Sequence, residues 1–338
     1  MKRAFVRAGI AVTLLIPSSP ASMADPLLLA GIGFGSQVNR GRVITVNEAT
    51  AAGTLLPGQG AGPVAGLNGL TFDAMSALYG SAISNPVFGD PATGAPTLVQ
   101  LDPATGTSLF SVPITFGGNP LEVVDLAAQP STGVIYGTSF TSTVPGTSIY
   151  TIDKTTGEAT LVGVTGVIGV TLSFAPNATL YMSSATFTPA GVQTGSFLHT
   201  VSPLTGAVLS TVAIGALPSG NLVHIGGLGV RPTDGALFAA GREATAAQRG
   251  DIYTLSTTGT ATLVGSTGVG EVGDLDFTPI PEPATLLLLG TGLAGVGAAA
   301  RKRRGTKASA AAAYRAIELS RPRLAGYNVG RYGQINEL

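Results

Sequence analysis

The sequence has no cysteine and no tryptophan, and only two of its 338 residues are histidine, His199 and His224. Without cysteine, the chain has no disulfide, no thiolate metal site and no cysteine nucleophile. With so few imidazoles, any metal site would depend mainly on oxygen ligands. His199 lies in a strand-like run with no carboxylate nearby in the sequence, and we expect it to be structural.

Positive charge is scarce in the body of the chain. Residues 25–279 contain a single lysine, Lys154, and far more acidic than basic side chains, whereas both ends of the chain are basic. The formal net charge of zero is therefore the sum of an acidic body and two basic ends. Nucleic-acid binding needs clustered lysine and arginine to displace counterions from phosphates, so we expect no nucleic-acid partner.

Motifs for common cofactors and hydrolases are also missing. The glycines of Gly31-Ile-Gly33-Phe-Gly35 lack the strand–loop–helix setting of a phosphate loop, and no Gly-x-Ser-x-Gly or His-Glu-x-x-His motif occurs. We therefore predict no cofactor. Glycine (48) and proline (22) are abundant, which favours many short strands joined by turns over helices.

The first 24 residues have the pattern of a secretory signal peptide. Lys2, Arg3 and Arg7 precede an apolar run over residues 8–17, and small residues stand before Asp25. A basic start, an apolar middle and a small-residue exit are the signals for export and cleavage. The secretion machinery is therefore an expected partner, with residues 1–24 removed.

The C-terminal region contains three features in a fixed order. Pro281-Glu282-Pro283 comes first, the apolar run 284–300 follows, and a basic cluster completes the region at Arg301, Lys302, Arg303 and Arg304. As a helix, the apolar run would extend about 26 Å, which is just enough to cross a thin bilayer. We predict a marginal transmembrane helix over 284–300 with its basic end in the cytoplasm.

Motif, span and basic stop together resemble the PEP-CTERM sorting domain, which is handled by exosortase-type membrane enzymes. The resemblance covers residues 280–304 and implies cleavage near Pro281-Glu282-Pro283 after transient insertion in the inner membrane. It also implies delivery to the cell envelope or the outside of the cell, in a biofilm matrix, with exopolysaccharide or other envelope components as partners. A basic tail, residues 305–338, continues beyond the usual end of the pattern.

The body, residues 25–279, is an internal repeat. One unit reads Ile-Tyr-Thr-Ile-Asp, Thr-Gly, Ala-Thr-Leu-Val-Gly, Leu-Ser-Phe-Ala-Pro and Leu-Tyr across residues 149–181, and it recurs across residues 252–279. Weaker copies bring the number to five, with starts near residues 43, 98, 149, 198 and 252. Four strands in about 50 residues is the period of a propeller blade. The Thr-Gly pair supplies the positive φ that a tight hairpin needs.

The pattern resembles YVTN-like and quinoprotein-like β-propeller repeats. The resemblance implies that Leu-x-Phe-x-Pro is the innermost strand of a blade and that Leu-Tyr opens the second. Ile-Tyr-x-Ile-Asp would then form the third strand and Ala-Thr-Leu-Val-Gly the outermost. The body then ends on an inner strand, 272–278, and begins on an unpaired run, 27–33.

Pairing 27–33 with 272–278 would complete a blade and leave no open edge at the closure. The sequence therefore predicts an all-β fold, a five-bladed β-propeller latched between its two ends. A β-sandwich is the alternative, because strand spacing alone does not exclude it.

Candidate site residues come from aligning the five inner strands on their shared leucine. Four residues before that leucine stand Gly66, Glu122, Ile168, His224 and Glu271. Blades two and five share Glu-Val-x-Asp-Leu, which adds Asp125 and Asp274 one residue before the leucine. Converging at an axial mouth, Glu122, His224 and Glu271 could hold a divalent cation, and all five could perform acid–base work on a sugar. The alternative is that they are solvated loop residues.

Two functions remain open from the sequence. The first is an exported surface or matrix protein whose propeller is a non-enzymatic binding or structural module. The second is an extracellular propeller hydrolase or lyase acting on polysaccharide. A permanently anchored membrane protein is a third possibility, and it requires the span 284–300 to survive processing.

Overall fold

The structure is a computed structural model that describes residues 25–33, 39–60, 66–82, 95–140, 146–243 and 250–280, together with Arg315. Ala24–Ile280 form one compact unit. The predicted signal peptide, the sorting motif 281–283, the span 284–300, the basic stop 301–304 and most of the tail lie outside the described residues. Within the described part of the chain, no helix is apolar and long enough to traverse a bilayer.

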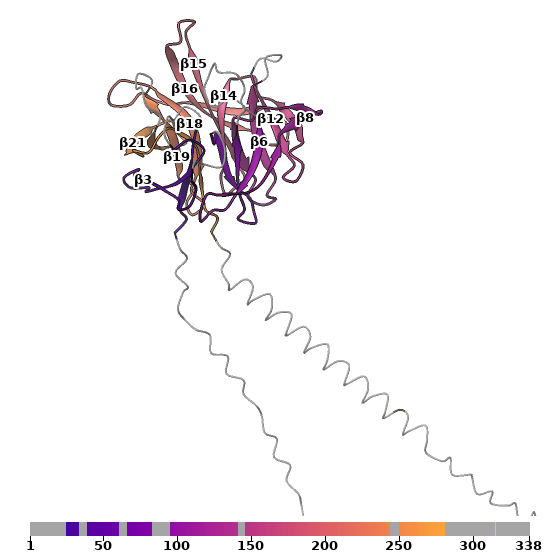
Figure 1. Cartoon of the computed structure of the whole chain (residues 1–338). Coiled ribbons are helices and arrows are strands. Elements are labelled where there is room, and N and C mark those ends of the chain that lie inside the picture. Colours follow the sequence, from indigo (N-terminus) through magenta and orange to yellow (C-terminus); the bar gives the residue numbers. More distant parts are fainter. Residues whose placement is uncertain are drawn as a thin grey trace, which may run out of the picture. The chain divides into compact units, whose positions relative to one another are not determined.

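The body is a five-bladed β-propeller, as predicted, in which each blade is a four-stranded antiparallel sheet (Figure 1). Blade 1 contains β4 (Gly69–Phe72), β5 (Leu78–Ala82), β6 (Thr97–Leu101) and β7 (Ser108–Pro113). Blade 2 contains β10 (Asp125–Ala128), β11 (Ile135–Phe140), β12 (Thr147–Ile152) and β13 (Ala159–Val164). Blade 3 contains β14 (Gly169–Phe174), β15 (Leu180–Phe187), β16 (Gln193–Val201) and β17 (Val208–Ala213).

The remaining blades complete the ring. Blade 4 contains β18 (Val223–Val230), β19 (Leu237–Glu243), β20 (Asp251–Leu255) and β21 (Ala261–Ser266). Blade 5 contains, from the inside outwards, β22 (Val272–Phe277), β1 (Leu28–Ile32), β2 (Val43–Val46) and β3 (Gly53–Leu55). A short hairpin of β8 (Thr115–Phe116) and β9 (Asn119–Pro120) lies between blades 1 and 2 in the sequence.

The two ends of the body meet in blade 5 and form the predicted latch. Strands β1 and β22 pair from Leu28 opposite Phe277 to Ile32 opposite Val272. Beyond the strands, the Leu27 N–H donates to Thr278 Oγ1 at 2.8 Å, and the Thr278 N–H donates to the Leu27 carbonyl at 2.8 Å. The latch closes the ring. Each inner strand contacts both of its neighbours, in the order β4, β10, β14, β18, β22 and back to β4.

The predicted strand order within a blade is also confirmed. Leu-Ser-Phe forms the end of the inner strand β14, Leu180-Tyr181 opens the second strand β15, and Ala-Thr-Leu-Val-Gly forms the outermost strand β13 of blade 2. The Thr-Gly glycines take positive φ in four blades, at Gly106, Gly157, Gly206 and Gly259. The first copy of the repeat has no Thr-Gly pair, and there Ala51 (φ 64°) takes the left-handed conformation.

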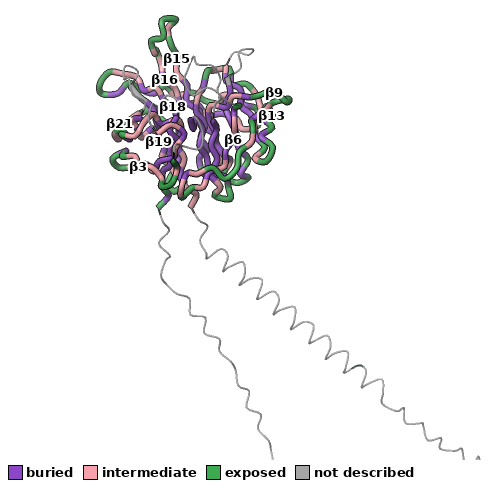
Figure 2. Tube along the Cα trace, viewed as in Figure 1, coloured by how far each residue is buried: buried purple, intermediate pink, exposed green. Residues whose placement is uncertain are grey.

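The core consists of five apolar clusters, and each of them fills the space between two neighbouring blades. Tyr136 of blade 2 packs edge-on against Phe174 of blade 3, and Phe238 of blade 4 packs in the same way against Phe277 of blade 5. Figure 2 shows the buried residues at the centre and the exposed ones on the outer strands and loops. Both faces of the inner strands are covered, so most of their residues are buried, polar ones included.

Candidate functional site on the propeller axis

The innermost strand of every blade is an edge strand, so some of its backbone N–H groups point to the axis without a partner in the ladder. Such buried donors must find acceptors elsewhere, because a buried unpaired amide is costly. At the level of the aligned leucines, all five N–H groups find acceptors on two carboxylates. The leucines are Leu70, Leu126, Leu172, Leu228 and Leu275.

Asp274 of β22 accepts three of these five amides. Its Oδ2 accepts the Leu70 N–H of blade 1 at 2.8 Å, and its Oδ1 accepts the N–H groups of Leu228 at 3.2 Å and Leu275 at 2.8 Å. The side chain therefore joins blade 5 to both of its neighbours, blades 4 and 1.

Asp125 of β10 accepts the other two amides. The Leu126 N–H donates to Oδ1 at 2.9 Å, and the Leu172 N–H of blade 3 donates to Oδ2 at 2.5 Å. This carboxyl group joins blade 2 to blade 3. Together Asp125 and Asp274 connect all five inner strands, and both residues are 0% exposed.

Asp125 and Asp274 also hydrogen-bond to each other across the axis. Burial raises the pKa of Asp125 to about 8, because a charged carboxylate is poorly solvated there. The pKa of Asp274 is raised well above its usual range by burial and by the adjacent Asp125. Two carboxyl groups can hydrogen-bond to each other only when one of them is protonated, and the raised pKa values mean that the pair holds at least one proton at neutral pH.

Glycines make room for this pair. The same position of the inner strand holds Gly69 in blade 1 and Gly227 in blade 4. A Cβ on Gly69 would lie 2.6 Å from the Leu126 nitrogen, and a Cβ on Gly227 would lie 2.6 Å from the Asp274 Cα. In blade 3 the position holds Thr171, whose Oγ1 donates to Ser183 Oγ at 2.9 Å. The axis thus accommodates two carboxyl groups because two of its five positions have no side chain.

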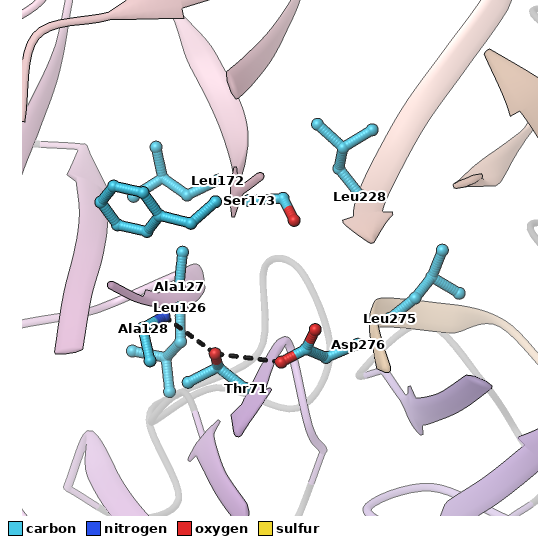
Figure 3. Close-up of a pocket in the computed structure, with 10 residues that line it drawn as sticks. Thr71, Leu126, Ala127, Ala128, Leu172, Ser173, Leu228, Leu275 and Asp276 are labelled. Atoms are coloured by element: carbon cyan, nitrogen blue, oxygen red, sulfur yellow. Dashed lines mark hydrogen bonds between the residues drawn. The ribbon is translucent and has the colours of Figure 1, made fainter. Parts of the chain in front are cut away.

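A second layer lies two residues further along the inner strands (Figure 3). Asp276 Oδ2 accepts the Phe72 N–H at 2.7 Å, and Asp276 Oδ1 accepts the Phe277 N–H at 2.8 Å. Thr71 Oγ1 donates to Asp276 Oδ2 at 3.2 Å and accepts the Ala128 N–H at 2.9 Å. Burial raises the pKa of Asp276 to about 6.

The second layer borders a cavity of about 20 Å³, to which all five inner strands contribute lining residues. That volume holds roughly one water molecule. Ser173 and Asp276 present oxygen atoms to the cavity in Figure 3. The cavity is far too small for a sugar or another organic substrate.

The predicted mouth residues lie where the inner strands begin. Glu122 precedes β10, Glu271 directly precedes β22, and His224 is the second residue of β18; all three are partly exposed. The His224 ring packs edge-on against Phe187 of blade 3, with centroids 5.7 Å apart. Among the described residues, no three histidine or acidic side chains form a group that could hold a metal ion. The structure thus brings Asp125 and Asp274 together, and it forms no such group from Glu122, His224 and Glu271.

His199 is almost completely buried in blade 3. Its Nε2 lies 2.7 Å from Ser184 Oγ, and its Nδ1 lies 2.9 Å from Thr211 Oγ1. Burial lowers the pKa of His199, so the ring is neutral at pH 7. The imidazole thus joins strands β15, β16 and β17 by side-chain contacts, as expected for a structural histidine.

Sequence reasoning missed Thr71 and Asp276 as axial residues. The signal was present, because Asp276 stands two residues after Asp274 and Thr71 two residues after Gly69. Residues i and i+2 of a strand share a face, so a second axial layer follows from the first.

Residues 279–304 match the PEP-CTERM protein-sorting motif. This match confirms the resemblance drawn from the Pro-Glu-Pro sequence, the apolar span and the basic stop. The motif implies a protein that is exported, passes through the membrane while anchored there, and is sorted by exosortase. Among curated proteins, none matches the chain in sequence.

Several solved structures are similar at low identity. Hydrazine synthase of Kuenenia stuttgartiensis is 12% identical over 59% of this chain and 48% of its own, with a TM-score of 0.36. This chain thus spans about half the length of that protein. Periplasmic gluconolactonase of Pseudomonas aeruginosa is 12% identical over 76% of this chain and 100% of its own, with a TM-score of 0.44. Glutaminyl cyclase of Myxococcus xanthus is 17% identical over 59% of this chain and 68% of its own, with a TM-score of 0.37. Likeness at these levels assigns no activity to this chain.

Proposed function

We propose that the protein is an exported cell-surface or matrix protein whose propeller is a non-enzymatic binding or structural module. The observation that carries this proposal is the use of Asp125 and Asp274, the buried carboxyl groups that hold the five inner strands together. Groups that accept five backbone amides inside the core serve ring closure rather than reaction with a polymer.

The arrangement of the body suits display at a surface. Leu27 and Thr278 are hydrogen-bonded to each other, so both ends of the body leave from one face. The inner strands begin at the opposite face, from which the hairpin of β15 and β16 projects (Figure 1). Glu122, His224 and Glu271 lie at that far face, which stays accessible when the ends are tethered.

The sorting motif specifies the partners we propose. The secretion machinery would remove residues 1–24, and an exosortase-type enzyme would cut near Pro281-Glu282-Pro283 after transient insertion of residues 284–300. The latch strands β1 and β22 lie inside both cleavage points, so processing would leave the ring closed. An exopolysaccharide or another envelope component is the proposed ligand of the far face.

The test is a comparison of binding and cleavage with exopolysaccharide from the producing strain. We expect the exported protein to be retained by the polymer without releasing fragments. A triple variant, Glu122→Gln, His224→Gln and Glu271→Gln, is expected to lose at least tenfold in affinity. Co-sedimentation measures retention, and chromatography of the soluble sugars measures cleavage.

A matched control changes the opposite face, with Met75→Ser and Leu204→Ser at residues that are 81% and 85% exposed. This control should bind like the parent protein. Release of sugar fragments by the parent, abolished in the Asp125→Asn variant, would contradict the proposal and indicate the polysaccharide hydrolase or lyase.

A further inference from the structure

The axis contains three carboxyl groups, a high density of potential negative charge for the interior of a propeller. Asp125 and Asp274 are hydrogen-bonded to each other, and Asp276 lies two residues beyond Asp274 on the same strand. The three groups accept seven backbone N–H groups from all five inner strands, at distances between 2.5 and 3.2 Å.

The residues that face the pair from the other inner strands carry no charge. At the same level, β4 contributes Gly69, β14 contributes Thr171 and β18 contributes Gly227. Asp276 is the third titratable group, and its charge raises the pKa of Asp125 further. His224, at the start of β18, packs against Phe187. The partners of the pair are thus amide dipoles and another carboxyl group rather than a cation.

A shared proton makes this arrangement favourable. With one proton, the pair carries a single charge, which is solvated by five N–H groups and by the O–H of the partner. Without it, two adjacent buried carboxylates repel each other, and their mutual hydrogen bond is lost. Because each carboxyl group joins neighbouring blades, that repulsion acts directly on the closure of the ring.

We propose that Asp125 and Asp274 form a proton-dependent clasp, which closes the five inner strands while the pair shares a proton and loosens the axis when that proton is lost. The ring is consequently most firmly closed on the acidic side of neutrality. The inference concerns the folded body alone, so it stands independently of the proposed ligand and of sorting.

The sign of the pH dependence follows from linkage. An unfolded aspartate titrates near 3.9, and the folded pKa of Asp125 is about 8, so the folded state holds the extra proton between these values. Stability must therefore fall as the pH rises through this window. Asp276, with its pKa raised to about 6, acts in the same direction. Carboxyl groups with lowered pKa values, such as Asp73 and Asp234, lose their contribution only below this window.

The experiment measures thermal unfolding of the exported protein by calorimetry between pH 5 and pH 8.5, at constant ionic strength. We expect Tm to fall with rising pH, by roughly 3–5 °C per pH unit while one extra proton is held. The Asp125→Asn variant can donate its amide N–H to Asp274 and needs no shared proton. Its Tm should be lower than that of the parent at pH 5 and nearly constant with pH once Asp276 has ionised, so that the difference closes by pH 8.5.

The exposed Asp25→Asn variant is the control, and it should keep the parent's slope. If Asp125→Asn does not fold, hydrogen exchange in the parent protein provides the second measurement. After correction for intrinsic rates, the Leu126 and Leu172 amides should lose at least tenfold in protection between pH 6 and pH 8.5. A parent Tm that is constant or rises over this range, unchanged amide protection, or a folded Asp125→Asn variant with the parent's slope would each overturn the clasp.

Discussion

Replacing Asp274 by alanine is expected to lower the free energy of unfolding by about 3 kcal/mol, because three buried N–H groups lose their acceptor at once. These donors belong to Leu70, Leu228 and Leu275, which lie in three different blades. Removing the buried charge that the pair carries offsets part of the loss, so the effect is smaller than the sum of three lost acceptors. Urea unfolding at pH 6, monitored by circular dichroism, measures this change in the free energy of unfolding.

The control for this prediction is Asp25→Ala, which removes an exposed carboxylate near the start of the body. Surface changes of this kind stay within about 0.5 kcal/mol of the parent. If Asp274→Ala were as stable as the control, the carboxyl group would not be holding the inner strands, and the structural role assigned to it would be wrong.

Two neighbouring glycines of β18 provide the second large effect. Gly227→Ala is expected to destabilise the protein by about 2–3 kcal/mol, because the new Cβ would lie 2.6 Å from the Cα of Asp274 in the next blade. Gly226→Ala adds the same methyl group one residue earlier, where no atom lies within 4 Å of the built Cβ. The Gly226→Ala variant should therefore unfold within about 0.5 kcal/mol of the parent.

The comparison separates crowding at the axis from the general cost of changing a glycine in this strand. Equal urea midpoints for the two variants, at unchanged m-values, would show that blades 4 and 5 do not approach each other as closely as described. A larger loss of stability in Gly226→Ala than in Gly227→Ala would directly contradict the described packing of β18 against β22.

The architecture could be predicted because each blade repeats its own local signals. Leu-x-Phe-x-Pro, Leu-Tyr and Ala-Thr-Leu-Val-Gly assign strands in order, and the unpaired run at residues 27–33 has its partner at 272–278. The exception at Ala51 is local, because the first copy lacks the Thr-Gly pair and the turn takes its positive φ at a different residue.

The roles of the axial residues could not be predicted in the same way. The shared Glu-Val-x-Asp-Leu sequence identified Asp125 and Asp274, but a linear pattern does not show which side chains reach the axis or what they meet there. Three of their five amide partners belong to other blades, up to 204 residues away in the sequence. The need for Gly69 and Gly227 arises from the same convergence, since each lies against the backbone of a neighbouring blade.

The latch relates the fold to sorting. Strand β22 ends at Phe277, Thr278 is still hydrogen-bonded to Leu27, and the Pro-Glu-Pro sequence begins at Pro281. A cut at the motif would therefore remove no residue of the ring, whereas a cut inside β22 would remove the strand that carries Asp274 and Asp276. Folding and processing are compatible because the sorting signal begins just outside the closed blade.

The intact mass of the protein recovered from the cell surface or the medium tests the central claim most directly. The account predicts a chain that begins at Asp25 and ends within residues 280–283, without the apolar span, the basic stop and the tail. A recovered chain that still contains residues 284–304 would contradict it and indicate a permanently anchored protein.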